Sequence, residues 1–487
     1  MASDDPTLSG FEDSQGGTPA SSDSPSWKAP PRTWGGMLLA IGPAIVVSGS
    51  VIGSGELINV PVQAAKFGFV LFWAVILSCL IKYFLQVELG RYCLVHNRTT
   101  IQALNQIPGP KIRGTGWIGI LYIFGYTLSV VTVGGIMAAT AGLFTSVMPL
   151  GSDANTSTIG WGLIIFAIVG GVLWFSLYGA LEKLIAFLVC GFSLSVVVAL
   201  LLLIFSPNPK YPLTMADVTS GMTFSLGEPA QRGAILFAVI SLLGALGTTA
   251  NEMFMYPYWI LEKGYGDNLG TPDDEGWVDR AKGWIKVLQL DAGVATLLAG
   301  VITAAYFLVG CAILHKKGEV PSGMKVVEQL SQIYTETYGA WSYSVFMFGG
   351  FCTLFSTIVV VVAASGRMWT DLLSSMGAFE YENATARRTY NRIFQNIYLT
   401  AFLGLTIYSS VYGANPAELV ILGQWVNGVF NTPLLMIGVL YLAYQTDKRL
   451  RMSTITSLLL IATAAAIMGC ILIERFSSIF GFGGGGH

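Results

Sequence analysis

Charge is scarce in this sequence. Only 11 % of its 487 residues are Asp, Glu, Lys or Arg, whereas soluble domains contain about 25 %. Hydrophobic residues make up 53 % of the chain, and the formal net charge is −2. A basic patch with interleaved aromatic residues is absent, which argues against a nucleic-acid partner. The composition predicts an all-α protein that crosses a lipid bilayer several times.

Histidine and cysteine are also scarce. The three histidines, His96, His315 and His487, fall in expected loops or at the terminus, which leaves no His within a span for a proton relay. The six cysteines are scattered without a C-x-x-C pair, which argues against a thiolate metal site or a disulfide framework. Nucleophile-elbow, phosphate-loop and zinc motifs are absent as well. We therefore expect neither an enzyme nor a bound cofactor.

Long apolar runs dominate what is present. Windows of about 20 residues, the length that crosses a bilayer, fall at residues 37–60, 68–90, 117–147, 160–179, 184–205, 233–261, 286–314, 341–373, 393–412, 417–443 and 454–473. They predict eleven transmembrane helices. Residues 1–33 are expected to form a disordered cytoplasmic tail, because their first part is rich in Ser, Pro, Gly and Asp. A flexible end is expected at residues 481–487, around the run Gly483–Gly486.

The distribution of basic residues predicts the orientation. Of the 26 Lys and Arg residues, eighteen fall in loops on the side of the N-terminus and seven on the other side. Only Lys82 remains within a span. Cytoplasmic loops are enriched in Lys and Arg, so we expect an integral cell-membrane protein with its N-terminus in the cytoplasm and its C-terminus outside.

Two spans carry interruptions that a lipid-facing helix does not need. The first span contains Gly53-Ser54-Gly55-Glu56, and the sixth contains residues 244–252, which combine glycines and hydroxyls with Glu252. Gly weakens helices, and an ionised Glu at membrane depth is costly. Glycines can also serve close helix packing. Broken helices at matching positions of two halves, however, favour a transporter with inverted repeats and its site between the breaks.

The expected domain organisation follows from these breaks. Spans one to five and six to ten would form two repeats, at about residues 36–206 and 230–445, within a transport domain of residues 34–445. The eleventh helix, in residues 446–480, would be peripheral. Gly247 in the sixth span, with Ser54 and Gly55 in the first, would form the unwound turns.

Several stretches resemble the Nramp family of divalent-metal transporters. Gly42-Pro43 stands at the family's spacing before the break at Gly53. Further matches are Phe84-Leu85-Gln86 to Leu89-Gly90, then Asp291 with Ala295 and Ala299, and finally Leu422-Gly423-Gln424-Trp425-Val426 before Pro433. The similarity extends from about Gly42 to Tyr444 and implies a LeuT-like fold with a 5+5 inverted repeat and broken helices 1 and 6. It also implies that Gln424 approaches the metal.

Departures from the family pattern change the expected chemistry. Gly53 stands where the family has its metal-binding Asp, and Glu56 where it has Asn. The sixth-span motif that supplies a thioether becomes roughly Thr248-Thr249-Ala250-Asn251-Glu252-Met253, and no acid occurs at residues 128–131, where the family carries acids for proton transfer. The pattern is similar to the Nramp-related magnesium transporters, a branch that lacks the thioether and the proton pathway.

The resemblance implies a substrate site made of Glu56, Asn251, Glu252 and Gln424, with carbonyls near Gly53 and Thr248. All these ligands are oxygens, which suit Mg²⁺ better than softer metals. We therefore expect a carrier that moves a divalent cation, Mg²⁺-like before Mn²⁺, by alternating access and without proton coupling. The cation would be its substrate, and the oligomeric state is left open, with a monomer favoured.

Other interpretations remain open. The same fold can bind an amino acid or another small organic solute, with Ser48, Ser50, Ser54 and Thr248 around its carboxylate and Glu56 at its ammonium group. A membrane sensor without transport is a third class. Two converging carboxylates without a base would favour a metal, and one carboxylate opposite helix amides would favour a zwitterion.

Each candidate residue also has a structural interpretation. Glu56 could cap the second half of its helix, Glu252 could pair with a distant base, and Gln424 could tie helix backbones together. Asp291 is expected to be structural or part of a cytoplasmic gate. Lys82 is expected to pair or extend toward the inner interface, or else to act as a fixed positive charge in place of a coupled proton.

Overall fold

The computed structural model describes residues 27–41, 53–151, 153–175, 178–205, 210–228, 231–380 and 383–475. Within these ranges the protein is nearly all-helical, as the sequence predicts. Its β structure there is one antiparallel hairpin, β1 (Lys111–Ile112) with β2 (Thr115–Gly116). The Gly42-Pro43 motif, Ser48, Ser50 and most of both chain ends, including Gly483–Gly486, lie outside the described residues.

The first half of the chain begins with α2 (Trp34–Ala40). The helical elements that follow are η1 (Gly55–Asn59), α4 (Val60–Phe67), η2 (Gly68–Leu71), α5 (Phe72–His96), α6 (Thr100–Leu104), α7 (Trp117–Leu128), α8 (Val131–Val147), α9 (Ala154–Trp174), α10 (Tyr178–Phe205) and α11 (Met215–Ser220). The element η1 is a π-helix, a form that often occurs at functional sites.

The second half begins with α12 (Arg232–Ala245) and α13 (Ala250–Glu262). It continues with η4 (Asp267–Leu269), α14 (Trp277–Gly310), η5 (Cys311–His315), α15 (Val326–Leu330), α16 (Gln332–Tyr338), α17 (Ser342–Ser375), α18 (Ala384–Tyr412), α19 (Pro416–Val426), η6 (Asn427–Asn431), α20 (Thr432–Gln445) and α21 (Thr454–Arg475). Two of these elements, η5 and η6, are also π-helices.

Nine helical stretches of the described residues are long and apolar enough to cross a membrane. The window predicted at residues 393–412 lies in α18, which is long but carries Gln395, Asn396 and several hydroxyl side chains, and is not among the nine. Much of the first predicted window lies outside the described residues. The number of eleven spans, like the repeat boundaries, stays a prediction.

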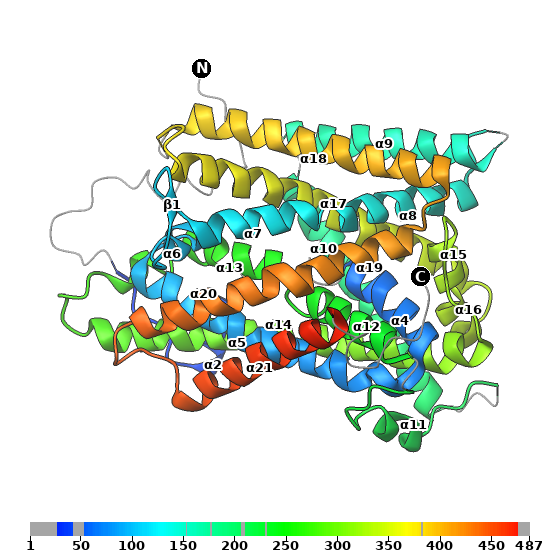
Figure 1. The fold of residues 1–487 in the computed structure, drawn as a ribbon, viewed down its shortest axis with the longest axis horizontal. Helices are drawn as coiled ribbons and strands as arrows, with labels where there is room; N and C mark the ends of the chain where they lie inside the picture. The colour runs from blue at the N-terminus through cyan, green and yellow to red at the C-terminus, as the bar shows by residue number, and fades with distance from the viewer. Residues whose placement is uncertain are drawn as a thin grey trace.

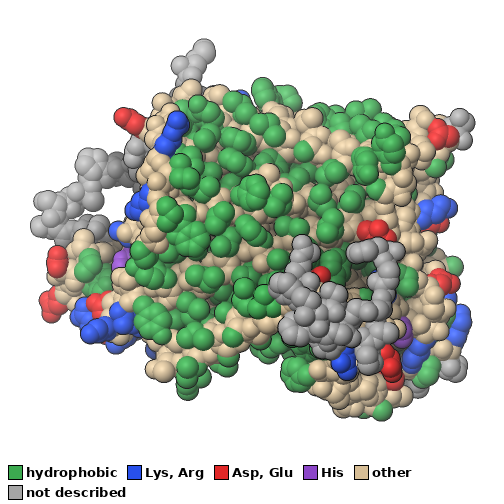
Figure 2. All heavy atoms as spheres, in the orientation of Figure 1, with side chains coloured by type: hydrophobic (Ala, Val, Ile, Leu, Met, Phe, Trp, Pro, Cys, Tyr) green, Lys and Arg blue, Asp and Glu red, His purple; other side chains and the backbone are tan. Residues whose placement is uncertain are grey.

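The long helices run roughly along one direction and pack side by side (Figure 1). Helix α14 packs against α5, α10 and α4, while α18 packs against α8, α9 and α17. The last helix, α21, lies at the periphery against α20, α12 and α5. Figure 2 shows hydrophobic side chains over the middle of the visible face and charged side chains at its two ends. This distribution fits a protein surrounded by lipid.

The break predicted in the sixth span is present. Helix α12 ends at Ala245 and α13 begins at Ala250. Gly247 between them has φ +62°, a left-handed conformation that favours glycine. In the first span Gly53 is a bend, helical structure begins at Ser54, and η1 follows; the chain just before Gly53 lies outside the described residues.

The tail expected to be disordered over residues 1–33 is packed from Trp27 onward. The Arg280 guanidinium lies over the Trp27 ring, 4.0 Å from its centroid. The Trp284 indole donates to the Lys28 carbonyl at 3.2 Å, and Thr33 caps the start of α2. Aromatic and polar partners on α14 therefore hold this segment.

Candidate functional site

The two helix breaks lie against each other. A side chain at Gly55 would approach the carbonyl oxygen of Ala245, the last residue of α12, to 3.1 Å. Glycine at this position thus permits the close approach of η1 to the end of α12. Between α12 and α13 the regular helical hydrogen bonding is interrupted, which leaves backbone groups there for other partners.

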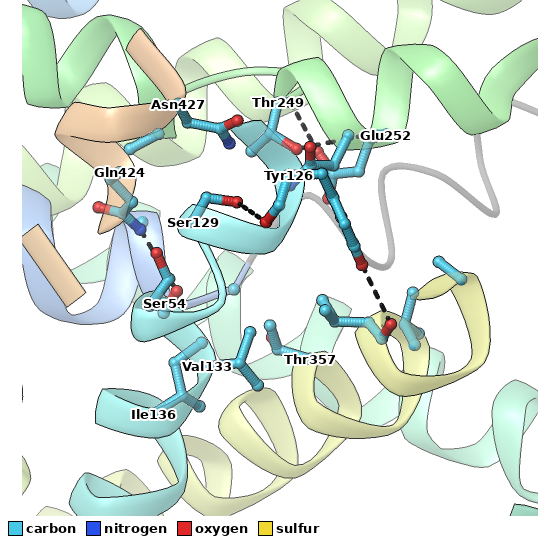
Figure 3. A pocket seen from close by; sticks show the side chains of 18 of the residues that line it. Ser54, Tyr126, Ser129, Val133, Ile136, Thr249, Glu252, Thr357, Gln424 and Asn427 are labelled. Atoms are coloured by element: carbon cyan, nitrogen blue, oxygen red, sulfur yellow. Dashed lines mark hydrogen bonds between the residues drawn. The ribbon is translucent and has the colours of Figure 1, made fainter. Parts of the chain in front are cut away.

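A cavity of about 90 Å³ lies beside the breaks (Figure 3). This volume is enough for several water molecules. Its walls come from η1, α7, α8, α12, α13, α17, α19 and η6, through Gly53, Ser54, Gly55, Tyr126, Ser129, Val130, Thr132, Val133, Ile136, Ala245, Thr249, Asn251, Glu252, Met255, Trp259, Thr357, Val360, Val361, Ala364, Gln424 and Asn427. Polar groups gather where η1, α13 and α19 meet, and apolar side chains of α8 and α17 form the facing wall.

Glu252 is the one acidic residue among those that line the cavity. Its Oε2 accepts the Thr249 backbone N–H at 2.7 Å, and the Thr249 hydroxyl accepts the Glu252 N–H at 3.3 Å. This capping box holds the carboxylate at the N-terminus of α13. Asn251 adds an amide, whose Oδ1 accepts the Tyr122 hydroxyl at 3.3 Å.

A buried chain of polar side chains joins the cavity to α12. The Gln424 amide donates to Ser54 Oγ at 3.4 Å, and its Oε1 accepts from Asn59 Nδ2 at 2.6 Å. Asn59 Nδ2 also donates to Ser241 Oγ at 2.9 Å. Asn59 Oδ1 is buried without a hydrogen-bond partner. Gln424 thus lines the cavity and also ties α19 to the first span, so both interpretations of it from the sequence have support.

Glu56 is not among the cavity-lining residues. Its side chain is fully buried; Oε2 accepts the Gly53 N–H at 3.2 Å, and Oε1 accepts the Thr303 hydroxyl of α14 at 3.2 Å. The carboxylate is therefore one hydrogen bond behind the cavity wall, in the capping arrangement considered from the sequence. Its direct contact with a substrate stays a prediction.

Thr248 and Lys82 hold the sixth-span break from the side of α5. The Thr248 hydroxyl donates to Gln86 Oε1 at 2.7 Å, and the Lys82 ammonium donates to the Leu246 carbonyl at 2.6 Å. Lys82 is only 1 % exposed. Lys82 thus pairs inside the protein rather than extending to the interface, and neither residue is among those that line the cavity.

Asp291 connects α14 to α13 away from the cavity. It is fully buried, and its Oδ2 accepts the Tyr256 hydroxyl at 2.9 Å. This contact agrees with the structural role considered from the sequence. A role in a gate stays a prediction.

The cavity wall formed by α7 and α8 carries no acid in the described structure. Leu128 ends α7, and α8 begins at Val131. Ser129 and Val130, between the two helices, line the cavity, and the Ser129 hydroxyl donates to the Tyr126 carbonyl at 2.7 Å. At this turn the described lining residues thus offer a hydroxyl and an apolar group.

The expectation of a site without a thioether ligand stays a prediction, but one methionine borders the cavity. Met255, one turn along α13 from Asn251, is part of the cavity wall, and Trp259 follows one turn further. The alignment from the sequence put Asn251 at the position of the family's thioether, and Met253, two residues on, is buried and is not among the lining residues. Helical spacing explains the result, because residues 251, 255 and 259 share one face.

Several polar residues near the cavity were missed from the sequence, among them Asn59, Tyr126 and Asn427. Asn59 and Asn427 stand within apolar runs, so an amide at membrane depth was the available signal. Tyr126 bonds to Ser365 of α17 at 2.6 Å. No pattern in the sequence indicated that contact.

The described residues contain no group of three or more His, Cys, Asp or Glu side chains arranged to hold a metal ion. A cation in this cavity would therefore be held by Glu252 together with amide, hydroxyl, carbonyl and water oxygens. Such neutral oxygens are normal ligands for hard cations.

The comparisons with known proteins agree with this architecture. The family model described as natural resistance-associated macrophage protein-like, Nramp, matches residues 44–475. The uncharacterized protein PM0681 of Pasteurella multocida is 21 % identical over 338 residues, which cover 69 % of this chain and 70 % of that protein.

Two solved structures show the fold. The manganese transporter of Eremococcus coleocola, in complex with an aromatic bis-isothiourea compound, has a TM-score of 0.60 at 15 % identity and covers 95 % of this chain and 91 % of its own. MhsT in complex with L-phenylalanine has a TM-score of 0.51 at 15 % identity, and the match covers 92 % of this chain and 99 % of the MhsT chain. The chain is thus an integral membrane transporter with the LeuT-like fold, and it belongs to the Nramp family, whose members transport divalent metal ions.

Proposed function

We propose that this protein carries a divalent cation across the membrane by alternating access, with Mg²⁺ favoured over Mn²⁺ and without a coupled proton. The observation that carries the proposal is the cavity beside the two helix breaks, where Glu252 stands among amide and hydroxyl oxygens. Family membership supports the metal as cargo. The Eremococcus coleocola relative of the same fold is a manganese transporter.

The donor set supports a hard cation that keeps part of its water. Glu252, Asn251, Gln424 and Ser54 provide oxygens, and the cavity of about 90 Å³ leaves room for water between them and the ion. Mg²⁺ loses water reluctantly and is often bound by one or two carboxylates. The thioether of Met255 is the one feature of the wall that favours a softer metal.

Charge near the site supports a cation over an anion. Glu252 faces the cavity, and Glu56 lies behind Gly53. Lys82 opposes both, but its ammonium is bound to the Leu246 carbonyl behind the wall. The cavity itself is lined by one acid and no base.

The absence of proton coupling is proposed from the wall of α7 and α8. Ser129 and Val130 stand at the turn between these helices, and the lining residues contribute no His and no second acid. Proton relays in transporters use chains of Asp, Glu or His. A single acid that also binds the cation does not form such a chain.

Alternating access is proposed from the contacts of the first span. Ser54 and Asn59 bond to Gln424 of α19 at 3.4 and 2.6 Å, and the Glu56 side chain bonds to Thr303 of α14. These contacts join the first span to α19 and to α14. Their rearrangement would open the cavity on one side. The cytoplasmic N-terminus and external C-terminus are part of this proposal, on the distribution of Lys and Arg alone.

The test is flux into proteoliposomes that contain a dye for the cation and a dye for luminal pH. We expect uptake of Mg²⁺ faster than that of Mn²⁺, with no luminal acidification. Acidification in step with metal uptake would contradict the uncoupled mechanism. A lack of uptake of either metal would contradict the proposal as a whole.

A second candidate, transport of a small organic zwitterion, has one observation in its favour. The cavity presents one carboxylate at the N-terminus of α13, opposite an apolar wall of Val133, Ile136 and Val361. MhsT, which shares the fold, was solved with L-phenylalanine. Uptake of radiolabelled neutral amino acids by the same liposomes, without any metal uptake, would favour this candidate.

A further inference from the structure

A second hollow lies far from the breaks, between the end of α9 and the start of α18. It encloses about 520 Å³ and is lined by Trp174, Ala384, Thr385, Arg388, Thr389, Arg392, Ile393 and Asn396. Two arginines and no acid are among these residues. On α18 they recur at intervals of three and four positions, so they form one stripe along the helix.

The outward direction of this stripe is fixed by aromatic contacts on the other side of α18. Phe394 stacks on Trp369 of α17 with centroids 5.1 Å apart, and Tyr390 stacks on Phe379 at 5.0 Å. The Trp369 indole also donates to the Tyr398 hydroxyl at 2.7 Å. These contacts hold α18 against α17, so that the opposite stripe faces α9 and the surroundings.

Arg392 is held in position by Trp174. Its guanidinium lies over the indole ring, 4.6 Å from the centroid, and donates to the Trp174 carbonyl at 3.3 Å. A guanidinium that is already oriented loses less freedom when it binds a phosphate, and its planar donors match phosphate oxygens. Thr385 and Thr389 add hydroxyls one turn apart on the same stripe.

The hollow continues into a surface that fits hydrocarbon. Ile393 is 44 % exposed and Ile397 54 % exposed on α18, and Trp174 is 53 % exposed at the end of α9. The two helices pack side by side (Figure 1). Tryptophan prefers the headgroup level of a bilayer. The arginines thus stand where a headgroup lies, and the isoleucines lie along the path of its acyl chain.

We propose that this hollow binds the phosphate headgroup of an anionic phospholipid, with Arg388 and Arg392 on the phosphate and the acyl chain along Ile393 and Ile397. Among the described residues the lining carries two arginines and no Asp or Glu, and this provides the charge complementarity, since basic pockets between membrane helices bind anionic headgroups. Continuity with the exposed apolar stripe favours a lipid over a soluble phosphate. The proposal is independent of the transported substrate.

The test uses quenching of Trp174 fluorescence in nanodiscs by brominated lipids. The Trp174→Phe variant provides the background from the other tryptophans. We expect brominated phosphatidylglycerol to quench Trp174 with roughly 25-fold preference over brominated phosphatidylcholine, at about fivefold for each arginine. The Arg388→Gln/Arg392→Gln variant should lose this preference. In Arg388→Gln alone, a change at an exposed position, the preference should fall about fivefold.

The matched control removes the same charge elsewhere at the same end of the molecule. Lys111→Gln/Arg113→Gln changes the exposed β1–β2 hairpin, and we expect it to retain the preference. Equal quenching by both lipids in the wild type, or an equal loss in the control, would overturn the proposal. Displacement of the lipid by soluble glycerol phosphate would assign the hollow to a free phosphate and would also overturn it.

Discussion

The two helix breaks share one local arrangement but direct their carboxylates differently. In each, a glutamate accepts the backbone N–H of the residue three positions earlier, Glu56 from Gly53 and Glu252 from Thr249. Glu56 is enclosed between η1 and α14, with Thr303 on its second oxygen. Glu252 remains partly exposed on the cavity wall. The same capping geometry therefore supports two roles, one behind the site and one at it.

This difference shows that an acid at a break is not by itself a ligand. The capping bond occupies one carboxylate oxygen in both cases. The position of the second oxygen then decides whether a substrate can be reached. At the first break the second oxygen accepts the Thr303 hydroxyl, whereas at the sixth break Glu252 is among the residues that line the cavity. We accordingly expect the two glutamates to differ when each is neutralised.

The largest effect is expected for Glu252→Gln. Loss of the only acid on the cavity wall should weaken Mg²⁺ binding by about 100-fold, equivalent to about 2.7 kcal/mol. Isothermal titration with Mg²⁺ measures this. The control is Glu262→Gln at the far end of the same helix, which should bind as the wild type does. Unchanged Mg²⁺ affinity in Glu252→Gln would contradict the different roles expected for Glu252 and Glu56.

A smaller effect is expected for Glu56→Gln. If its carboxylate acts through Gly53 rather than on the ion, Mg²⁺ affinity should fall by about tenfold, as for groups behind a metal ligand. The Thr303→Val variant, which removes the hydroxyl bond to Glu56, provides a paired measurement. Its Mg²⁺ affinity should fall by less than that of Glu56→Gln. If Glu56→Gln abolished binding while Glu252→Gln did not, the roles would be reversed.

Lys82→Met should change Mg²⁺ affinity and the stability of the protein in opposite directions. Removing the ammonium takes away a positive charge that opposes the cation, so Mg²⁺ affinity should rise about fivefold. The buried Leu246 carbonyl then loses its donor, which costs about 1–3 kcal/mol. Binding and thermal unfolding in detergent are measured on the same sample. A fall in both quantities would show that Lys82 acts only through the structure of the break.

The smallest effect is expected for Met255→Leu, which removes the sulfur while keeping the side-chain volume. If the ion sits at Glu252, the ratio of Mn²⁺ to Mg²⁺ affinity should change by less than about twofold. If the thioether contacts the ion, Mn²⁺ affinity should fall and that of Mg²⁺ should not. Competition binding with the two metals measures the ratio, and Met253→Leu, at a residue off the wall, is the control.

The sequence predicts the fold well because its signals are local and repeated. Apolar windows mark the long helices, and the glycines at residues 244 and 247 mark the break between α12 and α13. The matching position of Gly53–Glu56 then points to the region of the cavity. The resemblance to the Nramp family, from about Gly42 to Tyr444, lies largely within residues 44–475, which the family model matches.

Side-chain directions at the site could not be predicted in the same way. Regular helical spacing does not apply to η1, since a π-helix turns less per residue than an α-helix, so the direction of Glu56 depends on packing against α14. The contact of Tyr126 with Ser365 depends on how α7 meets α17. To predict that Met255 lines the cavity, one would have to know the start of α13 to within one residue.

The most direct measurement is anomalous scattering from a crystal of the protein soaked in Mn²⁺, which marks the ion's position. We expect a peak beside the Glu252 carboxylate and bordered by Asn251 and Gln424. The ion should lie within about 2.6 Å of the carboxylate, or be separated from it by one water molecule. A peak between Glu56 and Thr303, or one bound to Met255 without Glu252, would contradict this expectation.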